Sequence, residues 1–213
     1  MAIDVLLYDA YGTLWDVHSV MQRCESCWPG KGRQLSQLWR TKQLEATWQR
    51  SLMGRYVPFS TVTREALEYA CESLGLSLQK DHESELMAEY LKLATFPDVA
   101  DALMRKPAAK TGILSNGSPD MLEPLVRHSG LRFDAVLSVD AAKIFKPAPA
   151  AYQIAVERFG LPKDRIGFVS SNFWDAAGAK SFGFTVYWIN RGGVAAERLG
   201  WQPDRVLKTL AAL

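Results

Sequence analysis

The sequence predicts an α/β protein with a parallel β-sheet covered by helices on both faces, and with a helical segment inserted after the first strand. Three observations carry this prediction: short apolar runs alternate with longer amphipathic segments, one long stretch holds only helical patterns, and polar loops follow the apolar runs. Strands buried on both faces are near-continuous apolar runs, and the helices between them pack on the sheet. With 213 residues, 48% of them hydrophobic, the chain is long enough for one large core and a modest second module.

Five apolar runs are candidate strands, and helical patterns of ten or so residues separate the later ones. The runs cover residues 3–8, 111–114, 135–139, 166–169 and 185–189. The helical patterns cover residues 121–128, 150–159 and 174–182. Because this alternation requires crossover connections, the strands should be parallel and the crossovers right-handed.

Residues 17–93 break the alternation, because they contain no convincing strand and consist of successive amphipathic helical patterns. Two apolar stripes recur near helical spacing: Leu35, Leu38, Trp39, Leu44, Trp48 and Leu52, and then Val62, Leu67, Ala70, Cys71 and Leu74. We therefore predict a core domain formed by residues 1–16 and 94–213 and a helical cap domain formed by residues 17–93. An insertion at this point should lie over the carboxyl edge of the sheet, where doubly wound proteins bind their ligands.

The composition favours a small-molecule or protein partner. The formal net charge of +2 is too small for a nucleic-acid or membrane-surface binder. No run of 18 or more apolar residues exists, and neither a signal-peptide pattern nor a disulfide framework is evident, so we expect a cytoplasmic protein with reduced thiols. Cys24 and Cys27 form a C-x-x-C pair, but a lone pair lacks the four ligands of a structural zinc site.

Polar residues follow four of the predicted strands. They are Asp9 to Thr13, Ser115 to Ser118, Lys146-Pro147, and Ser170 to Asp175. Taken singly, each has a bland interpretation: Asp9 as a turn residue, Lys146 as a surface lysine, and Asp175 as an acidic residue in a helix first turn. Together they converge on one edge of a parallel sheet, which is where such proteins carry their sites.

In order, residue type and spacing, these four segments resemble the motifs of the haloacid dehalogenase superfamily. The resemblance spans residues 3 to about 190 and, with the helical insertion and the Arg40 helix, is strongest to the L-2-haloacid dehalogenases. It implies a Rossmann-like core, a helical cap, and an aspartyl-ester mechanism without a cofactor. Two departures separate the chain from the magnesium phosphatases of that superfamily: Tyr11 stands where they carry a second Asp, and Ser171 stands where they carry a further acid. Magnesium prefers carboxylate oxygens, whereas displacing a halide needs neither a metal nor a general acid.

The resemblance implies a role for each candidate residue. Asp9 would be the nucleophile, kept charged by Lys146 and oriented by Thr13. Ser115 would hold the substrate carboxylate, while Arg40 and Asn116 would hold the departing halide. Asp175 would activate the hydrolytic water, with Ser170 and Asn172 holding Asp175 and Lys146 in place. The substrate-binding set is completed by Ala10, Tyr11, Leu44, Phe59 and Trp174 around the substrate chain, and by Tyr152 near Lys146.

The sequence therefore predicts a hydrolase that converts small L-2-haloacids to 2-hydroxy acids with inversion at C2. Its ligands would be a 2-haloacid and a halide ion, with no metal, nucleic acid or membrane, and a homodimer is possible. Two alternatives stay open: a small-molecule phosphatase with a degenerate metal site, and a non-catalytic binding protein on the same fold. An arginine on a helix is more often a solvated surface residue, and the role of Arg40 depends on the resemblance.

Overall fold

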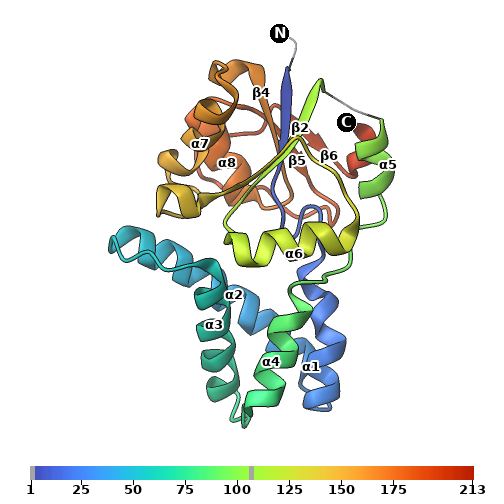
Figure 1. The fold of residues 1–213 in the computed structure, drawn as a ribbon, viewed down its shortest axis with the longest axis vertical. Helices are drawn as coiled ribbons and strands as arrows, with labels where there is room; N and C mark the ends of the chain where they lie inside the picture. Colours follow the sequence, from blue (N-terminus) through green and yellow to red (C-terminus); the bar gives the residue numbers. More distant parts are fainter. Residues whose placement is uncertain (1–2, 106–107) are drawn as a thin grey trace. The chain divides into compact units, whose positions relative to one another are not determined.

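A parallel β-sheet forms the centre of the larger of two compact units (Figure 1). The structure is a computed structural model that describes residues 3–105 and 108–213. Within them the sheet has six strands in the order β3-β2-β1-β4-β5-β6, and every pair is parallel. The strands are β1 (Val5–Tyr8), β2 (Lys110–Ser115), β3 (Ala135–Ser138), β4 (Ile166–Ser170), β5 (Thr185–Ile189) and β6 (Arg205–Leu207).

The strand order places a topological switch beside β1. Strand β1 pairs with β2 on one side and with β4 on the other, with Tyr8 opposite both Ile113 and Val169. The chain therefore winds outward in both directions from β1, and ligand sites form at the carboxyl ends of the strands next to such a switch. All residues of β1 and β4 are buried, as expected for central parallel strands.

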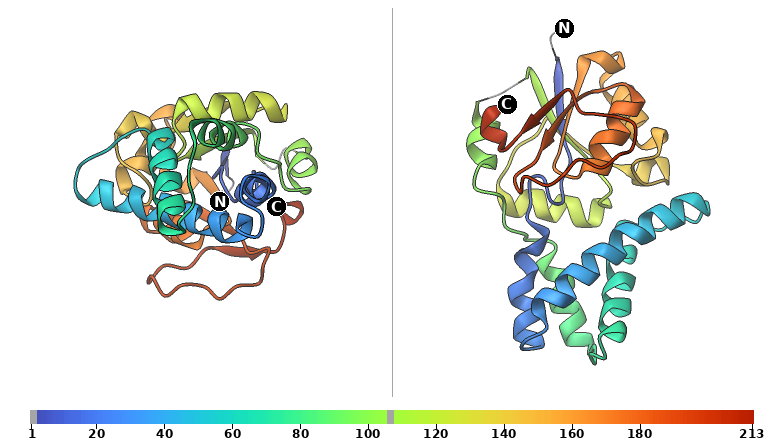
Figure 2. Two further views of the ribbon diagram at one scale, coloured as in Figure 1. Left: turned by 90° about the horizontal axis from the view of Figure 1, so that it is seen from below. Right: turned by 180° about the vertical axis from the view of Figure 1, so that it is seen from behind.

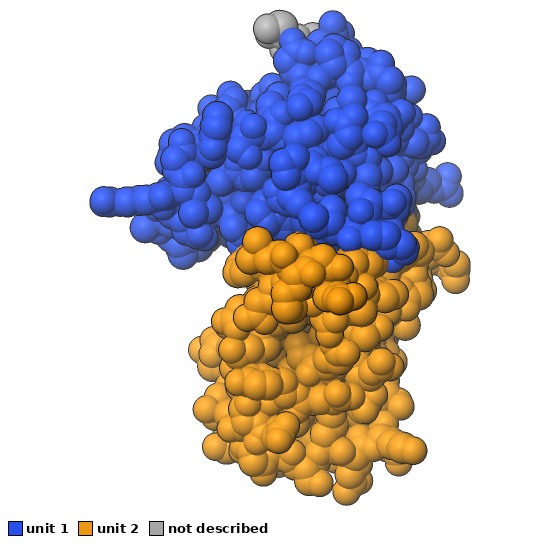
Figure 3. All heavy atoms as spheres, turned by 90° about the vertical axis from the view of Figure 1, so that its left-hand side faces the viewer, with its two compact units in different colours: residues 1–15, 95–116, 131–213 blue, residues 16–94, 117–130 orange. Residues whose placement is uncertain are grey.

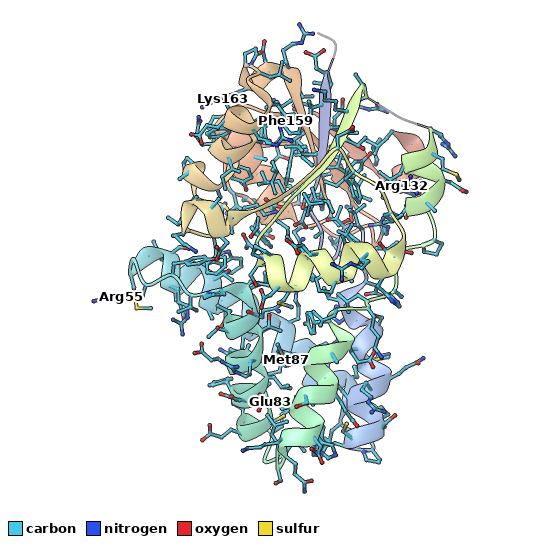
Figure 4. The ribbon with its side chains drawn as sticks, in the orientation of Figure 1. Arg55, Glu83, Met87, Arg132, Phe159 and Lys163 are labelled. Carbon is cyan, nitrogen blue, oxygen red and sulfur yellow. The ribbon has the colours of Figure 1, made fainter. Side chains whose placement is uncertain are left out.

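Helices flank the sheet on both sides. Helices α7 (Pro149–Phe159) and α8 (Phe173–Phe182) lie on one side, and α5 (Val99–Met104) lies on the other (Figures 1 and 2). Short 3-10 helices, η2 (Val139–Ala142), η3 (Lys163–Arg165) and η4 (Leu210–Ala212), complete the unit. Lys163, labelled in Figure 4, lies with its ammonium 3.7 Å from the centre of the Phe182 ring. This contact ties η3 to the end of α8.

The second unit is helical. The first unit comprises residues 1–15, 95–116 and 131–213, and the second comprises residues 16–94 and 117–130 (Figure 3). The elements of the second unit are η1 (Val17–Val20), α1 (Met21–Cys27), α2 (Gly32–Leu52), α3 (Phe59–Ser73), α4 (Lys80–Glu89) and α6 (Pro119–Ser129). Helix α6 packs against α3, where Thr63 Oγ1 lies 3.8 Å from Met121 Sδ. This unit therefore contains the segment predicted as a cap together with a helix that was assigned to the core.

The buried stripe of α2 differs from the predicted one. Leu35 and Trp39 are buried as expected, but the stripe continues through Gln43 and Thr47, four residues apart, rather than through apolar residues. Leu52 is 90% exposed. Each residue of a helix is rotated by about 100° from the one before it, so the five steps from residue 39 to residue 44 give about 500°, which is more than one full turn and not a whole number of turns. Leu44 and Leu52 therefore lie on a different face of the helix from Trp39.

The fold class predicted from the sequence is confirmed, and each of the five predicted strands is present to within two residues at either end. Strand β6 and helix α5 were missed, because three and six residues are too short for a detectable period. No helix among the described residues is long and apolar enough to span a lipid bilayer. The three cysteines are free.

Candidate active site

The site is built around Asp9, the first residue after β1. Its backbone N–H donates to Val169 O at 2.8 Å, so the strand pairing with β4 extends to the base of the side chain. Asp9 is only 5% exposed. The chain then turns sharply at Gly12, whose φ of +88° is a conformation that residues with a Cβ rarely adopt. This turn brings Thr13 back toward the carboxylate of Asp9.

Three side chains donate to one oxygen of Asp9. Oδ2 accepts from Thr13 Oγ1 at 3.1 Å, from Asn172 Nδ2 at 2.7 Å and, more weakly, from Ser170 Oγ at 3.5 Å. The donors come from the loop after β1, from the last residue of β4 and from the loop after it, and β1 and β4 are neighbouring strands. The sequence predicted that Ser170 and Asn172 hold Asp175 and Lys146, whereas both side chains donate to Asp9 Oδ2. Ser170 Oγ also accepts the N–H of Asn172 at 3.1 Å. The backbone still links Asn172 to Asp175, whose N–H donates to Asn172 O at 3.1 Å.

Lys146 bridges two carboxylates. Its Nζ donates to Asp9 Oδ1 at 2.9 Å, to Asp175 Oδ2 at 2.7 Å and to Leu114 O at 3.0 Å, which uses all three ammonium hydrogens. Burial of Lys146 alone would lower the pKa of its ammonium, but the charges of Asp175 and Asp9 outweigh this effect and raise the pKa. Lys146 therefore stays cationic beside Asp9 although both side chains are buried.

Asp175 occupies the first turn of α8 and is fully buried. Burial raises the pKa of Asp175 to about 6, although Lys146 opposes the change and the charge of Asp9 adds to it. Tyr152 on α7 donates to Asp175 Oδ1 at 2.7 Å. Burial, and next the charge of Asp175, hold the pKa of the Tyr152 hydroxyl well above its usual value, so Tyr152 remains a donor. A carboxylate with a pKa near neutrality suits a general base.

Ala10, Tyr11, Ser115, Asn116 and Trp174 lie in the same unit as Asp9. Ala10 is buried, and its carbonyl accepts the N–H of Thr13 at 3.2 Å, which closes the turn. The carbonyl of Tyr11 accepts from Asn172 Nδ2 at 3.1 Å. Ser115 ends β2 and is fully buried, and Trp174 is half-buried in α8. Their contacts with substrate stay predictions.

Asn116 has a donor to spare. Its Oδ1 accepts the N–H of Lys146 at 2.9 Å, which orients the amide. Its Nδ2 is buried and meets no acceptor among the residues that the structure describes. A buried amide donor without an acceptor is costly in a folded protein, so this group suits an anionic ligand.

Arg40, Leu44 and Phe59 belong to the helical unit. Arg40 and Leu44 are four residues apart in α2 and share one half-buried face. Phe59 is buried at the start of α3. The structure therefore groups these three with the insertion, as the sequence indicated, and their approach to Asp9 stays a prediction.

Sequence reasoning missed Gln43, which contacts Arg40. Gln43 is fully buried, accepts from Arg40 Nη1 at 2.7 Å and donates to Thr63 Oγ1 at 2.7 Å. The signal was present in the sequence, because residues 35, 39, 43 and 47 form one face of a helix and a glutamine lies within it. A buried amide in an apolar stripe is expected to orient a neighbouring polar group.

No group of three or more His, Cys, Asp or Glu side chains within residues 3–105 and 108–213 is arranged to hold a metal ion. Lys146 Nζ lies between Asp9 and Asp175, where it is a cation already in contact with both carboxylates. The donors around Asp9 are hydroxyl, amide and ammonium groups, and they stabilise its anionic carboxylate.

Comparisons with known proteins agree with this geometry. The family model described as haloacid dehalogenase-like hydrolase matches residues 3–183. An (S)-2-haloacid dehalogenase from Pseudomonas sp. (strain YL) is 48% identical over 212 residues, covering 98% of this chain and 91% of that protein. A haloacetate dehalogenase from Moraxella sp. (strain B) is 45% identical over 215 residues, covering 99% of this chain and 96% of that protein.

A solved structure extends the agreement to three dimensions. The L-2-haloacid dehalogenase from Xanthobacter autotrophicus with chloropropionic acid covalently bound has a TM-score of 0.92 and 40% identity, covering 98% of this chain and 96% of that one. Full-length identity at this level, together with the order of the four motifs around Asp9, leaves one assignment. This chain belongs to the L-2-haloacid dehalogenase family, within the haloacid dehalogenase-like hydrolases.

Proposed function

We propose that this protein is an (S)-2-haloacid dehalogenase, a hydrolase of carbon–halide bonds that converts small L-2-haloacids to 2-hydroxy acids with inversion at C2. The observation that carries the proposal is the buried Asp9 carboxylate, held by Lys146 at 2.9 Å on one oxygen and by Asn172 at 2.7 Å and Thr13 at 3.1 Å on the other. Support comes from relatives that bear this activity in their names and from one related structure with chloropropionic acid covalently bound.

In the first step an oxygen of Asp9 attacks C2 of the substrate. A C–O bond forms, the carbon–halogen bond breaks, and the halide leaves with the bonding electrons. A carboxylate is a weak nucleophile that must be aimed and partly freed from water. The hydrogen bonds from Thr13 and Asn172 orient the carboxylate of Asp9, and its burial removes most of its hydration.

The substrate carboxylate and the halide both need donors. We assign the carboxylate to Ser115 and nearby backbone N–H groups, and the halide to Arg40 and Asn116. The free Nδ2 of Asn116 supports the second assignment. Leu44, Phe59, Tyr11 and Trp174 would surround the carbon chain of the substrate, with Ala10 at the base of the turn.

In the second step water attacks the carbonyl carbon of the Asp9 ester. Asp175 takes a proton from this water, the bond between the Asp9 carboxyl carbon and the ester oxygen breaks, and the proton passes to that oxygen as the 2-hydroxy acid leaves. Lys146 contacts both carboxylates and balances the negative charge that develops on Asp9. The hydrogen bond from Tyr152 keeps Asp175 oriented. The product hydroxyl oxygen therefore originates from Asp9 rather than from solvent.

Halide release from (S)-2-chloropropionate in excess EDTA tests this function. A dehalogenase releases chloride there and gains nothing from added magnesium. A phosphatase would require magnesium, and a binding protein would release nothing. The matched control is Asp9→Asn, which keeps the size of the side chain and removes the nucleophile. Chloride release by this variant at the wild-type rate would refute the assignment.

An oxygen label separates ester formation from direct attack of water on C2. In one turnover with excess enzyme in heavy-oxygen water, the product should be largely unlabelled. After many turnovers the peptide containing Asp9 should carry the label. Labelled product from the first turnover, with no label in Asp9, would assign the attack to water.

The proposal includes a cytoplasmic location and a homodimer. The free cysteines support a reducing compartment. A core of residues 1–16 and 94–213 with a cap of residues 17–93 is likewise proposed. Limited proteolysis would test the cap boundaries, and light scattering would test the dimer.

A further inference from the structure

Arg191 joins four separate segments of the larger unit and has no part in the mechanism described above. It is the second residue after β5. Its Nη1 donates to Ser171 Oγ at 2.8 Å, and its Nη2 donates to Thr13 O at 3.2 Å and to Asp98 Oδ1 at 2.9 Å. The guanidinium carbon lies 4.1 Å from the centre of the Phe96 ring. An arginine can satisfy such spread acceptors because its donors form a rigid planar fork.

Two of these contacts are with the loops that hold Asp9. Thr13 donates its hydroxyl to Asp9 Oδ2 at 3.1 Å, and the same hydroxyl accepts the N–H of Ser171 at 2.8 Å. Ser171 lies between Ser170 and Asn172, whose side chains also donate to that oxygen at 3.5 Å and 2.7 Å. Arg191 thus bonds directly to Thr13, which is one donor to Asp9 Oδ2. It also bonds to Ser171, the sequence neighbour of the other two donors.

Asp98 anchors the guanidinium of Arg191. Its Oδ2 accepts from Thr209 Oγ1 at 2.7 Å and from the N–H of Leu210 at 2.8 Å, while Oδ1 accepts from Arg191. Burial opposes ionisation of Asp98, but the hydrogen bonds from Thr209, Leu210 and Arg191 outweigh it and lower the pKa of the carboxyl. Asp98 therefore remains an anion that anchors Arg191 to the C-terminal segment.

We propose that Arg191 is a positioning residue for the nucleophile: anchored by Asp98, it holds Ser171 and the carbonyl of Thr13, and so sets the direction of the Asp9 carboxylate. This inference builds on the proposed displacement by Asp9. A misplacement of about 1 Å can cost about 100-fold in rate, because displacement needs the attacking oxygen in line with the bond that breaks. Arg191 acts through the loops, so substrate binding should change little when it is altered.

Arg191→Lys tests the inference, because lysine keeps the charge and loses the fork. A single ammonium at the end of a flexible stem can pair with Asp98 without also reaching Ser171 and Thr13 O in the same directions. We expect kcat for chloride release to fall about 10- to 100-fold, with KM within about 3-fold of wild type. The matched control is Arg165→Lys, which alters an arginine that pairs with Asp4 at 2.6 Å. Asp4 precedes β1, so this pair lies at the amino ends of the strands, away from Asp9.

Single-turnover kinetics separate positioning from loss of folded enzyme. With enzyme in excess, a misaimed Asp9 lowers the maximum rate constant of chloride release. A merely structural role would instead leave that constant unchanged and raise the enzyme concentration needed to reach it. An unchanged maximum rate constant in Arg191→Lys overturns the inference. Chloride release by the wild-type enzyme, measured alongside, tests the proposed function independently.

Ser171→Ala is the second variant, in case Arg191→Lys does not fold. It keeps the pair of Arg191 with Asp98 and removes only the hydrogen bond at 2.8 Å to the loop. We expect a smaller loss, about 3- to 10-fold in kcat, the scale of one net hydrogen bond. In the double variant the fold-loss in kcat should be smaller than the product of the two single fold-losses, because both substitutions act through the same loop. A wild-type kcat in Ser171→Ala, or fully multiplicative losses, would contradict the inference.

Discussion

Replacing Asp175 by asparagine removes one negative charge from the site and keeps the shape of the side chain. In the wild-type protein Asp175 Oδ2 accepts from Lys146 at 2.7 Å and Oδ1 accepts from Tyr152 at 2.7 Å. The amide oxygen can keep the bond from Lys146, and the amide nitrogen can donate to the Tyr152 hydroxyl, because a hydroxyl both donates and accepts. We therefore expect the variant to fold and to keep the contact between Asp9 and Lys146.

The two chemical steps should respond very differently. Ester hydrolysis loses its general base, and such a loss costs about 100- to 10,000-fold. Displacement of halide keeps Asp9 and every donor to it, so its rate should change far less. Weakening one buried charged hydrogen bond costs about 1.5–3 kcal/mol of stability, less than an abandoned buried charge would, because Lys146 still pairs with Asp9. In a chain of this size that lowers Tm by about 3–12 °C.

Rapid-mixing measurement of chloride gives the decisive readout. Asp175→Asn should release about one equivalent per active site quickly and then turn over slowly, and intact-mass analysis should find the enzyme heavier by the acyl fragment. The matched control is Asp204→Asn, since Asp204 also pairs with a lysine, Lys180 at 2.7 Å, but is exposed to solvent. This control should turn over at the wild-type rate.

Two outcomes would refute the division of labour between Asp9 and Asp175. Normal steady turnover in Asp175→Asn would show that hydrolysis does not need this carboxylate. A folded variant that releases no chloride at all would show that Asp175 serves the displacement. Circular dichroism and the Tm distinguish the second outcome from loss of the fold.

Three further predictions follow from the same geometry. Arg40→Lys should lose about 10- to 1,000-fold in turnover, the scale of a lost preorganised donor. A near-normal rate in a folded variant would show that Arg40 is a solvated surface residue without a role in the reaction. Burial raises the pKa of Asp175 to about 6, and only its ionised form can accept a proton. We therefore expect kcat to rise about tenfold per pH unit below pH 6 and to level off above it. A pH-independent kcat from pH 5 to 7 would contradict the role of Asp175 as base. Gly178→Ala should destabilise the protein, although alanine favours helices, because the new Cβ would lie 2.5 Å from Pro147 Cβ and 2.6 Å from the Tyr152 hydroxyl oxygen. Such overpacking costs about 1–3 kcal/mol of stability. An unchanged or higher Tm in a melting experiment would contradict this prediction.

Much of the fold could be predicted from the sequence because its signals are local. A strand such as β4, buried on both faces, begins with an apolar run of four residues, 166–169, and a helix such as α7 begins at a proline and ends before a glycine. The sequence order of such elements already implies a parallel sheet. Strand β6 carries no such signal, because two of its three residues are exposed and its pairing with β5 alone defines it.

The residues that meet around Asp9 were likewise visible in the sequence, because their loops follow strands and the carboxyl ends of parallel strands meet at one edge. Asp9, Lys146 and Asp175 could be named as a group on that basis. Which atom bonds to which could not. Ser170 and Asn172 were expected to hold Asp175 and Lys146, and their side chains instead donate to Asp9 Oδ2. These partners depend on how the loop after β4 packs against the loop after β1, and no local sequence pattern records that packing.

By itself, the sequence determined the class of fold, the helical insertion and the set of chemical groups around Asp9. Only the tertiary structure decided which side chains bond to one another. Around Asp9, Lys146 is shared between two carboxylates, and Arg191 reaches Thr13 and Ser171 from 178 and 20 residues away. Within the helical unit, the buried Gln43 contacts Arg40. The physical reason is the range of the forces involved. Propensity and hydrophobic periodicity act over a few residues and leave a pattern in the chain, whereas a hydrogen bond between distant segments depends on how strands and loops pack in three dimensions.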